Sequence, residues 1–166
     1  MKRPHSIIKL LCLLLLAVPA ALAQEEEAVD NPVEIRVEIF LVSEVQGEEQ
    51  FRPATTARPG QTVEYRFTAA NIGPDTLPQG SVEILGQVPQ GTTYVPNSAT
   101  PSSERILTEF SADGGQSFYE DRVFVEEDGE RRLAGQEEYD AILWTLLVDM
   151  EPGQEEQFFY RVTVDR

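Results

Sequence analysis

Apolar and polar residues alternate along several short stretches of the chain, a period typical of β-strands with one buried face. In residues 33–41 every odd position is apolar, and Glu34, Arg36 and Glu38 occupy the other face. Phe40 and Val42 interrupt the polar face, which indicates burial under a neighbouring segment or, as the weaker alternative, an exposed contact. The apolar face comprises Val33, Ile35, Val37, Ile39 and Leu41.

Further stretches show the same alternation or short runs of β-branched and aromatic residues. They cover 63–69, 81–88, 92–95, 106–110, 123–125, 142–148 and 158–164. Turn sequences separate them, including Pro59-Gly60, Pro89-Gln90-Gly91, Asp113-Gly114, Asp128-Gly129 and Pro152-Gly153. Residues 44–57 lack a regular period and are predicted to form a polar connection. The one helical candidate, 131–139, contains Gly135, which argues against a helix.

This spacing of short strands and turns predicts an all-β protein, an antiparallel sandwich of two sheets. Trp144 is expected in the core, because a Trp that stacks on sugars would need an exposed face. The alternation assigns a shared core to Tyr65, Phe67, Trp144, Leu146, Tyr160 and Val162.

Two parts of the chain resemble a known family of bacterial surface proteins. The first consists of Pro59-Gly60, Tyr65, Asn71-x-Gly73-Pro74, Val88-Pro89-x-Gly91-Thr92, Tyr94-Val95 and Ser98, and the second runs from Trp144 to Val164. They resemble domain of unknown function 11, the conserved repeat domain. The resemblance covers roughly 33–164, and it implies an immunoglobulin-like sandwich in an exported protein without implying a chemistry. Members often occur as tandem repeats. The chain resembles a single repeat that stands alone, which favours the role of an accessory subunit over that of a stalk.

The first 23 residues have the features of a cleaved secretory signal. Lys2, Arg3 and Lys9 precede or border the apolar run 10–18, and Ala21-Leu22-Ala23 forms a cleavage site before Gln24. Cys12 lies inside the apolar run, so a lipid anchor is not expected. No other segment is apolar enough to span a membrane. The expected organisation is a signal peptide at 1–23, an acidic flexible tether at 24–32 and a sandwich domain at 33–166.

Loss of the signal would leave a strongly acidic chain without histidine or cysteine. Ten basic residues would remain against 29 acidic ones, a net charge of −19, so nucleic acid and anionic lipid surfaces are poor partners. His5 and Cys12 both belong to the signal. Without them, the usual zinc, copper and haem sites and Ser-His-Asp or Cys-His catalysis lack their side chains. We therefore predict no cofactor and no enzymatic activity.

The abundant carboxylates suggest two further kinds of site. Adjacent acidic residues on a strand point to opposite faces, so the doublets cannot be glycosidase pairs. Calcium would suit the acidic turns Asp113-Gly114-Gly115 and Glu126–Glu130, but neither has the spacing of an EF-hand. Turn formation explains both, and we assign no metal or catalytic residue.

Surface binding remains as the expected function. The favoured hypothesis is a non-catalytic, exported module of the cell envelope, in the periplasm or at the cell surface, that docks on a larger surface-layer or secretion assembly. Strand edges or outward apolar residues would make the contact. The alternatives are a soluble carbohydrate- or ligand-binding module, which needs exposed Phe40, Tyr119 and Phe159, and a calcium-dependent adhesion module. Homo-oligomerisation stays open. The outward apolar candidates are Phe40, Val42, Leu143, Leu147 and Phe159.

Overall fold

Ten antiparallel β-strands and one 3-10 helix make up residues 31–166, the part of the chain that the computed structural model describes. The predicted signal peptide, and the predicted tether apart from Asn31 and Pro32, lie outside these residues. The elements are β1 (Val33–Val45), β2 (Glu48–Pro53), β3 (Thr62–Asn71), β4 (Glu83–Gln87), β5 (Thr92–Tyr94), β6 (Ile106–Ser111), β7 (Phe124–Glu127), β8 (Glu130–Leu133), η1 (Gln136–Glu138), β9 (Ala141–Leu146) and β10 (Glu155–Val164). The predicted all-β class is confirmed.

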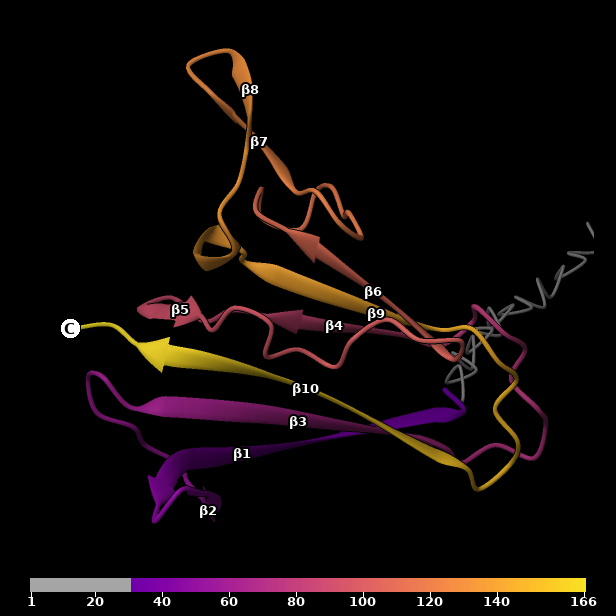
Figure 1. Ribbon diagram of the computed structural model, residues 1–166. Coiled ribbons are helices and arrows are strands. Elements are labelled where there is room, and N and C mark those ends of the chain that lie inside the picture. The colour runs from indigo at the N-terminus through magenta and orange to yellow at the C-terminus, as the bar shows by residue number, and fades with distance from the viewer. Residues whose placement is uncertain (1–30) are drawn as a thin grey trace, which may run out of the picture. The chain divides into compact units, whose positions relative to one another are not determined.

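The strands form a five-stranded sheet, a three-stranded sheet and a two-stranded hairpin (Figure 1). The large sheet has the order β2-β1-β3-β10-β5, the smaller sheet has the order β4-β9-β6, and β7 pairs with β8. Trp144 of β9 joins the two sheets, since its ring lies 5.8 Å from that of Phe67 on β3 and 5.7 Å from that of Phe158 on β10. This arrangement is consistent with a β-sandwich.

The predicted core lies between these two sheets. Trp144 is fully buried, and its indole N–H donates to the Thr100 carbonyl oxygen at 3.2 Å, so its one polar atom is satisfied. Leu146, Tyr160 and Val162 are also buried, as predicted. The predicted members Tyr65 and Phe67 are only partly buried, although both pack against the core. Their partial exposure shows that the cover over β3 is incomplete.

The smaller sheet does not extend across the full width of the larger one. Phe110 of β6 contacts Tyr94 of β5 at a ring distance of 5.9 Å. At the other side, Gly86 of β4 lies so close to Tyr160 and Trp144 that an added Cβ would come within 3.0 Å and 2.9 Å of their rings. The smaller sheet therefore covers β5, β10 and part of β3, and no strand of the described chain faces the first half of β1.

Residues 44–57 differ from the polar connection that the sequence predicts. β1 continues to Val45, Gln46 and Gly47 make a turn with φ of 57° and 85°, and β2 returns alongside β1. All six residues of β2 are exposed, and among the described strands β2 pairs with β1 alone. A strand without a buried face needs no apolar alternation, and this is why the sequence pattern missed it.

Two predicted turns occur where expected. Asp128-Gly129, with φ of 53° and 81°, joins β7 to β8. The loop with Asp113-Gly114 connects Phe110 to Tyr119, whose backbones exchange hydrogen bonds of 2.8 and 3.0 Å. The rejected helical candidate 131–139 contains the end of β8 and the single turn η1.

Candidate functional site

Three apolar side chains on the inner face of β1 are exposed. Ile35 and Val37 are each 50% exposed and Ile39 is 37% exposed, and we call these three residues the β1 row. The predicted alternation is correct, because Leu41, two positions after Ile39 on the same face, is buried. The expectation of a half-buried strand is wrong for the β1 row, since the three-stranded sheet ends before it reaches β1.

The backbone edge beside the β1 row is also open. β2 pairs with β1 only from Phe40 to Val45. The Ala54 N–H donates to the Ile39 carbonyl oxygen at 3.0 Å, so Ile39 directs its backbone polar groups away from β3. Ile35 and Val37 do the same, because this direction alternates along an antiparallel strand. Within residues 31–166, nothing pairs with Ile35 or Val37 on that side.

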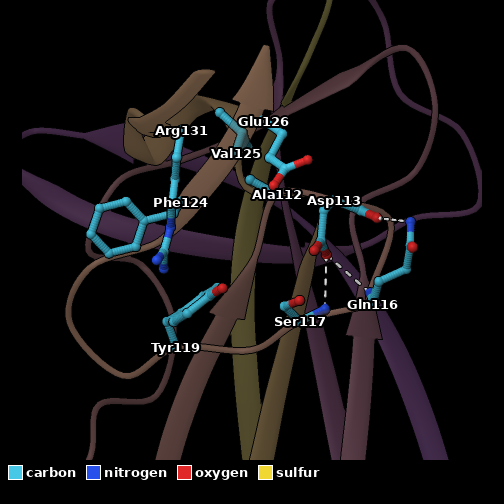
Figure 2. A pocket seen from close by; sticks show the side chains of 9 residues that line it. All are labelled: Ala112, Asp113, Gln116, Ser117, Tyr119, Phe124, Val125, Glu126 and Arg131. Carbon is cyan, nitrogen blue, oxygen red and sulfur yellow. Dashed lines mark hydrogen bonds between the residues drawn. The ribbon is translucent and has the colours of Figure 1, made fainter. Parts of the chain in front are cut away.

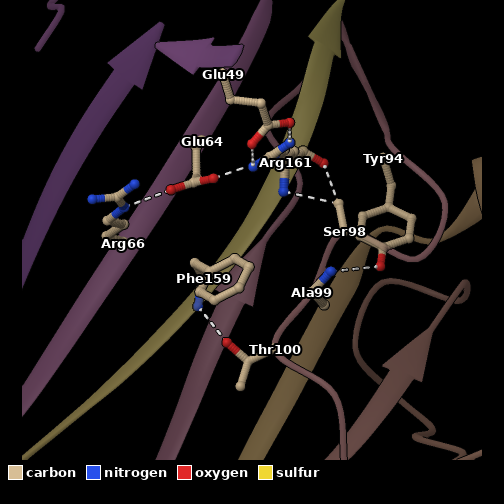
Figure 3. A network of polar contacts seen from close by, with 9 residues as sticks. All are labelled: Glu49, Glu64, Arg66, Tyr94, Ser98, Ala99, Thr100, Phe159 and Arg161. Carbon is tan, nitrogen blue, oxygen red and sulfur yellow. Dashed lines mark hydrogen bonds and ion pairs between the residues drawn. The ribbon is translucent and has the colours of Figure 1, made fainter. Parts of the chain in front are cut away.

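The outer face of the same sheet is covered by an ionic network (Figure 3). Glu64 of β3 is only 2% exposed, and its carboxylate accepts hydrogen bonds from Arg66 and from Arg161. Arg161 also binds Glu49 of β2 with two hydrogen bonds, of 2.7 and 2.8 Å. Both oxygens of Glu64 are engaged, so this carboxylate joins β3 to β10 rather than offering a base or a metal ligand, and Arg161 extends the network to β2 through Glu49.

The network shifts the acid–base behaviour of its members. The hydrogen bonds from Arg161 lower the pKa of Glu49 below its ordinary value. The same bonds, together with those to Glu64, raise the pKa of Arg161. Glu49 and Arg161 are thus both charged near neutral pH, and they fix β2 against the outer face.

The predicted outward apolar residues do not form one surface. Phe40 and Val42 are half-buried, and the Arg66 guanidinium lies 4.5 Å from the centre of the Phe40 ring. Phe159 is half-buried on β10, where its backbone N–H donates to Thr100 Oγ1 at 2.9 Å. Leu143 and Leu147 belong to β9 and the residue after it, and only Leu147 is exposed, at 38%. Of the predicted contacts, the open strand edge is therefore better placed than these side chains.

The acidic turns that were considered for calcium have other contacts. Asp113 Oδ1 accepts hydrogen bonds from the Ser111 hydroxyl and from the backbone N–H groups of Gln116 and Ser117, which lower the pKa of Asp113. In the second turn, Glu127 pairs with Arg132. Among residues 31–166, no group of three or more acidic, His or Cys side chains could hold a metal ion.

A polar cavity of about 570 Å³ lies between the β7–β8 hairpin and the loop that follows β6 (Figure 2). Tyr119, one of the three aromatic candidates for sugar binding, lines it, whereas Phe40 and Phe159 do not. Phe124 lies beside Tyr119 with the rings 6.0 Å apart and nearly perpendicular, and Arg131 lies over Phe124 at 4.0 Å. The flat strip of three aromatic residues is not assembled, but one of its members is part of a cavity.

Comparisons with known proteins supply no family or function. No family model, curated protein or solved structure matches the chain. The resemblance to the conserved repeat domain stays a prediction. Over residues 31–166 no helix is long and apolar enough to cross a membrane.

Two features of these sites were missed in the sequence. The exposure of the β1 row depends on how many strands the facing sheet has, and no residue of β1 encodes that number. The buried Glu64 occupies a polar position of an alternating strand, where an exposed carboxylate is expected. Its only signal is Arg66 two positions later on the same face.

Proposed function

We propose that the protein is a non-catalytic interaction module of the cell envelope, which docks on another envelope protein by pairing its open β1 edge with an extended segment of that partner. The single observation that carries this proposal is the coincidence of a free backbone edge and an exposed apolar row in residues 33–39. An immunoglobulin-like sandwich in an exported protein is part of the same proposal, supported by the strand pattern and the signal sequence.

Pairing along β1 would satisfy both features at once. An added antiparallel strand offers N–H and C=O groups to Ile35 and Val37, and its own inward side chains lie next to the β1 row. Burying the remaining exposed half of three aliphatic side chains contributes on the order of 3 kcal/mol. A micromolar complex needs about 8 kcal/mol, so the apolar row alone is insufficient and the backbone pairing must contribute.

Charge defines the partner segment further. Residues 31–166 contain 10 arginines against 25 acidic residues, a net charge of −15. On the outer face of β1, Arg36 is already engaged by Glu34 and Glu155, and Glu38 adds a further negative charge. The segment that fits alternates small apolar residues with basic ones. A second copy of this chain fits less well, because two such acidic bodies repel each other.

The residues before β1 are unsuited to pair with its open edge. Residues 24–30 have the sequence QEEEAVD, with four acidic residues and no alternation of apolar side chains. They would add negative charge next to Glu34 and Glu38 and would supply few apolar contacts for the β1 row. The occupant is therefore expected to come from another molecule.

Site-specific cross-linking tests the docking surface. A photoreactive residue at position 37 should capture an envelope protein that the same residue at position 85 does not capture. Leu85 is a matched control, since it is 47% exposed but lies on the outer face of β4. The cross-linked peptide of the partner should alternate apolar and basic residues, and the purified partner should slow hydrogen exchange at the amides of Ile35 and Val37.

The salt dependence of binding and substitutions on β1 distinguish docking of a basic partner from self-association. Binding of a basic segment weakens as salt rises, whereas self-association of an acidic protein strengthens. Replacing Ile35 and Val37 together with Thr should weaken partner binding at least tenfold, and Leu85→Thr should leave it unchanged. Equal capture from positions 37 and 85, or cross-links solely between copies of this chain, would overturn the proposal.

Export has a separate test. Cleavage after Ala23 predicts an intact mass for the exported protein that corresponds to a chain beginning at Gln24. Recovery of the full precursor, or of a lipid-modified Cys12, from purified envelope would contradict it.

A further inference from the structure

The cavity beside the β7–β8 hairpin has walls from two separate parts of the chain. Phe124, Glu126 and Arg131 come from the hairpin, and Asp113 and Tyr119 come from the segment after β6 (Figure 2). Its volume of about 570 Å³ falls in the range of small-molecule sites. The hairpin forms a sheet of its own and lies on the far side of β9 and β10 from β1 (Figure 1), and no residue of β1 lines the cavity.

An acid and a base face this cavity without pairing with each other. Glu126 and Arg131 are directly opposite in the β7–β8 ladder, where opposite charges normally pair. Instead, the Arg131 guanidinium lies over the Phe124 ring. No hydrogen bond or ion pair joins the side chain of Glu126 or Arg131 to another residue in the described part of the chain. The neighbouring Arg132 behaves differently, because it pairs with two carboxylates, those of Glu127 and Glu138.

The cavity is held in place from both sides. Val123, at the root of the hairpin, is 1% exposed, and its carbonyl oxygen accepts the Ala134 N–H at 2.9 Å. On the loop side, the Asp113 carboxylate binds two backbone N–H groups and the Ser111 hydroxyl. Tyr119 is fixed by its backbone pairing with Phe110. These bonds organise the walls before any ligand binds, which lowers the entropic cost of binding.

The mixture of groups selects the ligand class. An anionic ligand would meet the carboxylates of Glu126 and Asp113, and an apolar ligand would leave Glu126 and Arg131 without partners. Neighbouring sugar hydroxyls can donate to a carboxylate and accept from a guanidinium, and the apolar face of a sugar ring packs on an aromatic ring. We infer that this cavity binds a neutral oligosaccharide, with Glu126 and Arg131 bonding its hydroxyls and Tyr119 or Phe124 contacting its ring face.

Titration with defined sugars tests this inference. The purified protein is titrated with cellotetraose, mannotetraose and the tetramer of N-acetylglucosamine, and tetragalacturonate serves as the anionic counterpart. At least one neutral sugar should bind with a Kd below about 1 mM. The NMR shifts that this sugar causes in the protein should map to Tyr119, Phe124 and Arg131. Tetragalacturonate should bind at least tenfold more weakly.

Four variants locate the site, and each should melt like the parent. Glu126→Gln and Arg131→Gln should each weaken binding about tenfold, which corresponds to about 1.4 kcal/mol. Glu130→Gln is the matched control for the acid, because Glu130 lies in the same hairpin but outside the cavity lining, and Arg122→Gln is the control for the base. The inference is overturned if no neutral sugar binds, if tetragalacturonate binds as tightly, or if the control variants weaken binding equally. None of these results bears on the β1 edge, which shares no residue with the cavity.

Discussion

β1 and β10 lie on either side of β3 in one sheet, and both alternate apolar with charged or polar residues. On β10 the inward residues are completely buried: Phe158, Tyr160 and Val162 are 0%, 1% and 0% exposed. On β1, Val37 and Ile39 lie across β3 from Phe158 and Tyr160 and are 50% and 37% exposed, and only Leu41, across from Val162, is buried. The same pattern therefore gives a core strand at one place and an open surface at the other.

Two differences in the surroundings explain the contrast. Trp144 packs on Phe158 and Tyr160, whereas no strand of the smaller sheet lies over the β1 row. The edge of β10 is closed by the segment after β5, where Thr100 bonds to both backbone polar groups of Phe159. Among residues 31–166, the edge of β1 at Val37 has no such partner. Alternation fixes which side chains share a face, and the width of the facing sheet decides whether that face is buried.

Removal of the residue that covers β10 should have the largest effect. Trp144→Ala is expected to lower the free energy of unfolding by about 3–5 kcal/mol, the cost of deleting a large buried aromatic. Because whole domains are stable by only about 5–15 kcal/mol, the variant should show a much lower denaturant midpoint. Chemical denaturation followed by circular dichroism measures this difference. A midpoint equal to that of the parent would show that Trp144 does not hold the two sheets together.

Proline substitution distinguishes a paired position from an open one on the same strand. The Glu38 N–H faces β3, so Glu38→Pro leaves a carbonyl of β3 without its donor and should cost about 3 kcal/mol. The Val37 N–H faces the open edge, where proline is tolerated, so Val37→Pro should cost less than about 1 kcal/mol. Equal destabilisation of the two variants would show that the edge at Val37 is occupied.

The sequence predicted much of the fold and little of the candidate sites, for physical reasons. Strand parity follows from local alternation, and the turns follow from Gly and Asp residues, so β3, β9, β10 and the Asp128-Gly129 hairpin were predictable. Burial in a sandwich depends on contacts between strands far apart in the chain, so the exposed β1 row was not predictable. β2 was missed because it has no buried face, and the cavity at Arg131 was missed because two separate segments form it.

A pair of valines in the same sheet compares the two strands directly. Val162 is 0% exposed and Val37 is 50% exposed, and both point to the inner face. Val162→Ala should cost about 2 kcal/mol, since it removes two buried methyl groups and leaves a cavity. Val37→Ala should cost less than about 1 kcal/mol, because those methyl groups are half in water. Unfolding free energies for both variants provide the test, and similar values would mean that the β1 row is covered in solution.

The smallest expected effect concerns the half of β1 that β2 covers. Hydrogen bonds from Arg161 lower the pKa of Glu49 below its usual value of 4.5, so this contact stabilises the position of β2 fully above about pH 4.5. The stabilisation is lost as the pH falls through the lowered pKa, when Glu49 becomes protonated. Glu49→Gln imitates the protonated form at neutral pH. Hydrogen exchange at the Gln50 and Arg52 amides, which face β1, should become faster in this variant, while the amides of β10 stay protected. Glu48→Gln is the matched control, because its carboxylate makes no bond to Arg161. If Glu49→Gln and the parent exchange alike at neutral pH, the contact with Arg161 does not hold β2, and the closed and open halves of β1 differ by the β-turn at Gln46-Gly47 alone.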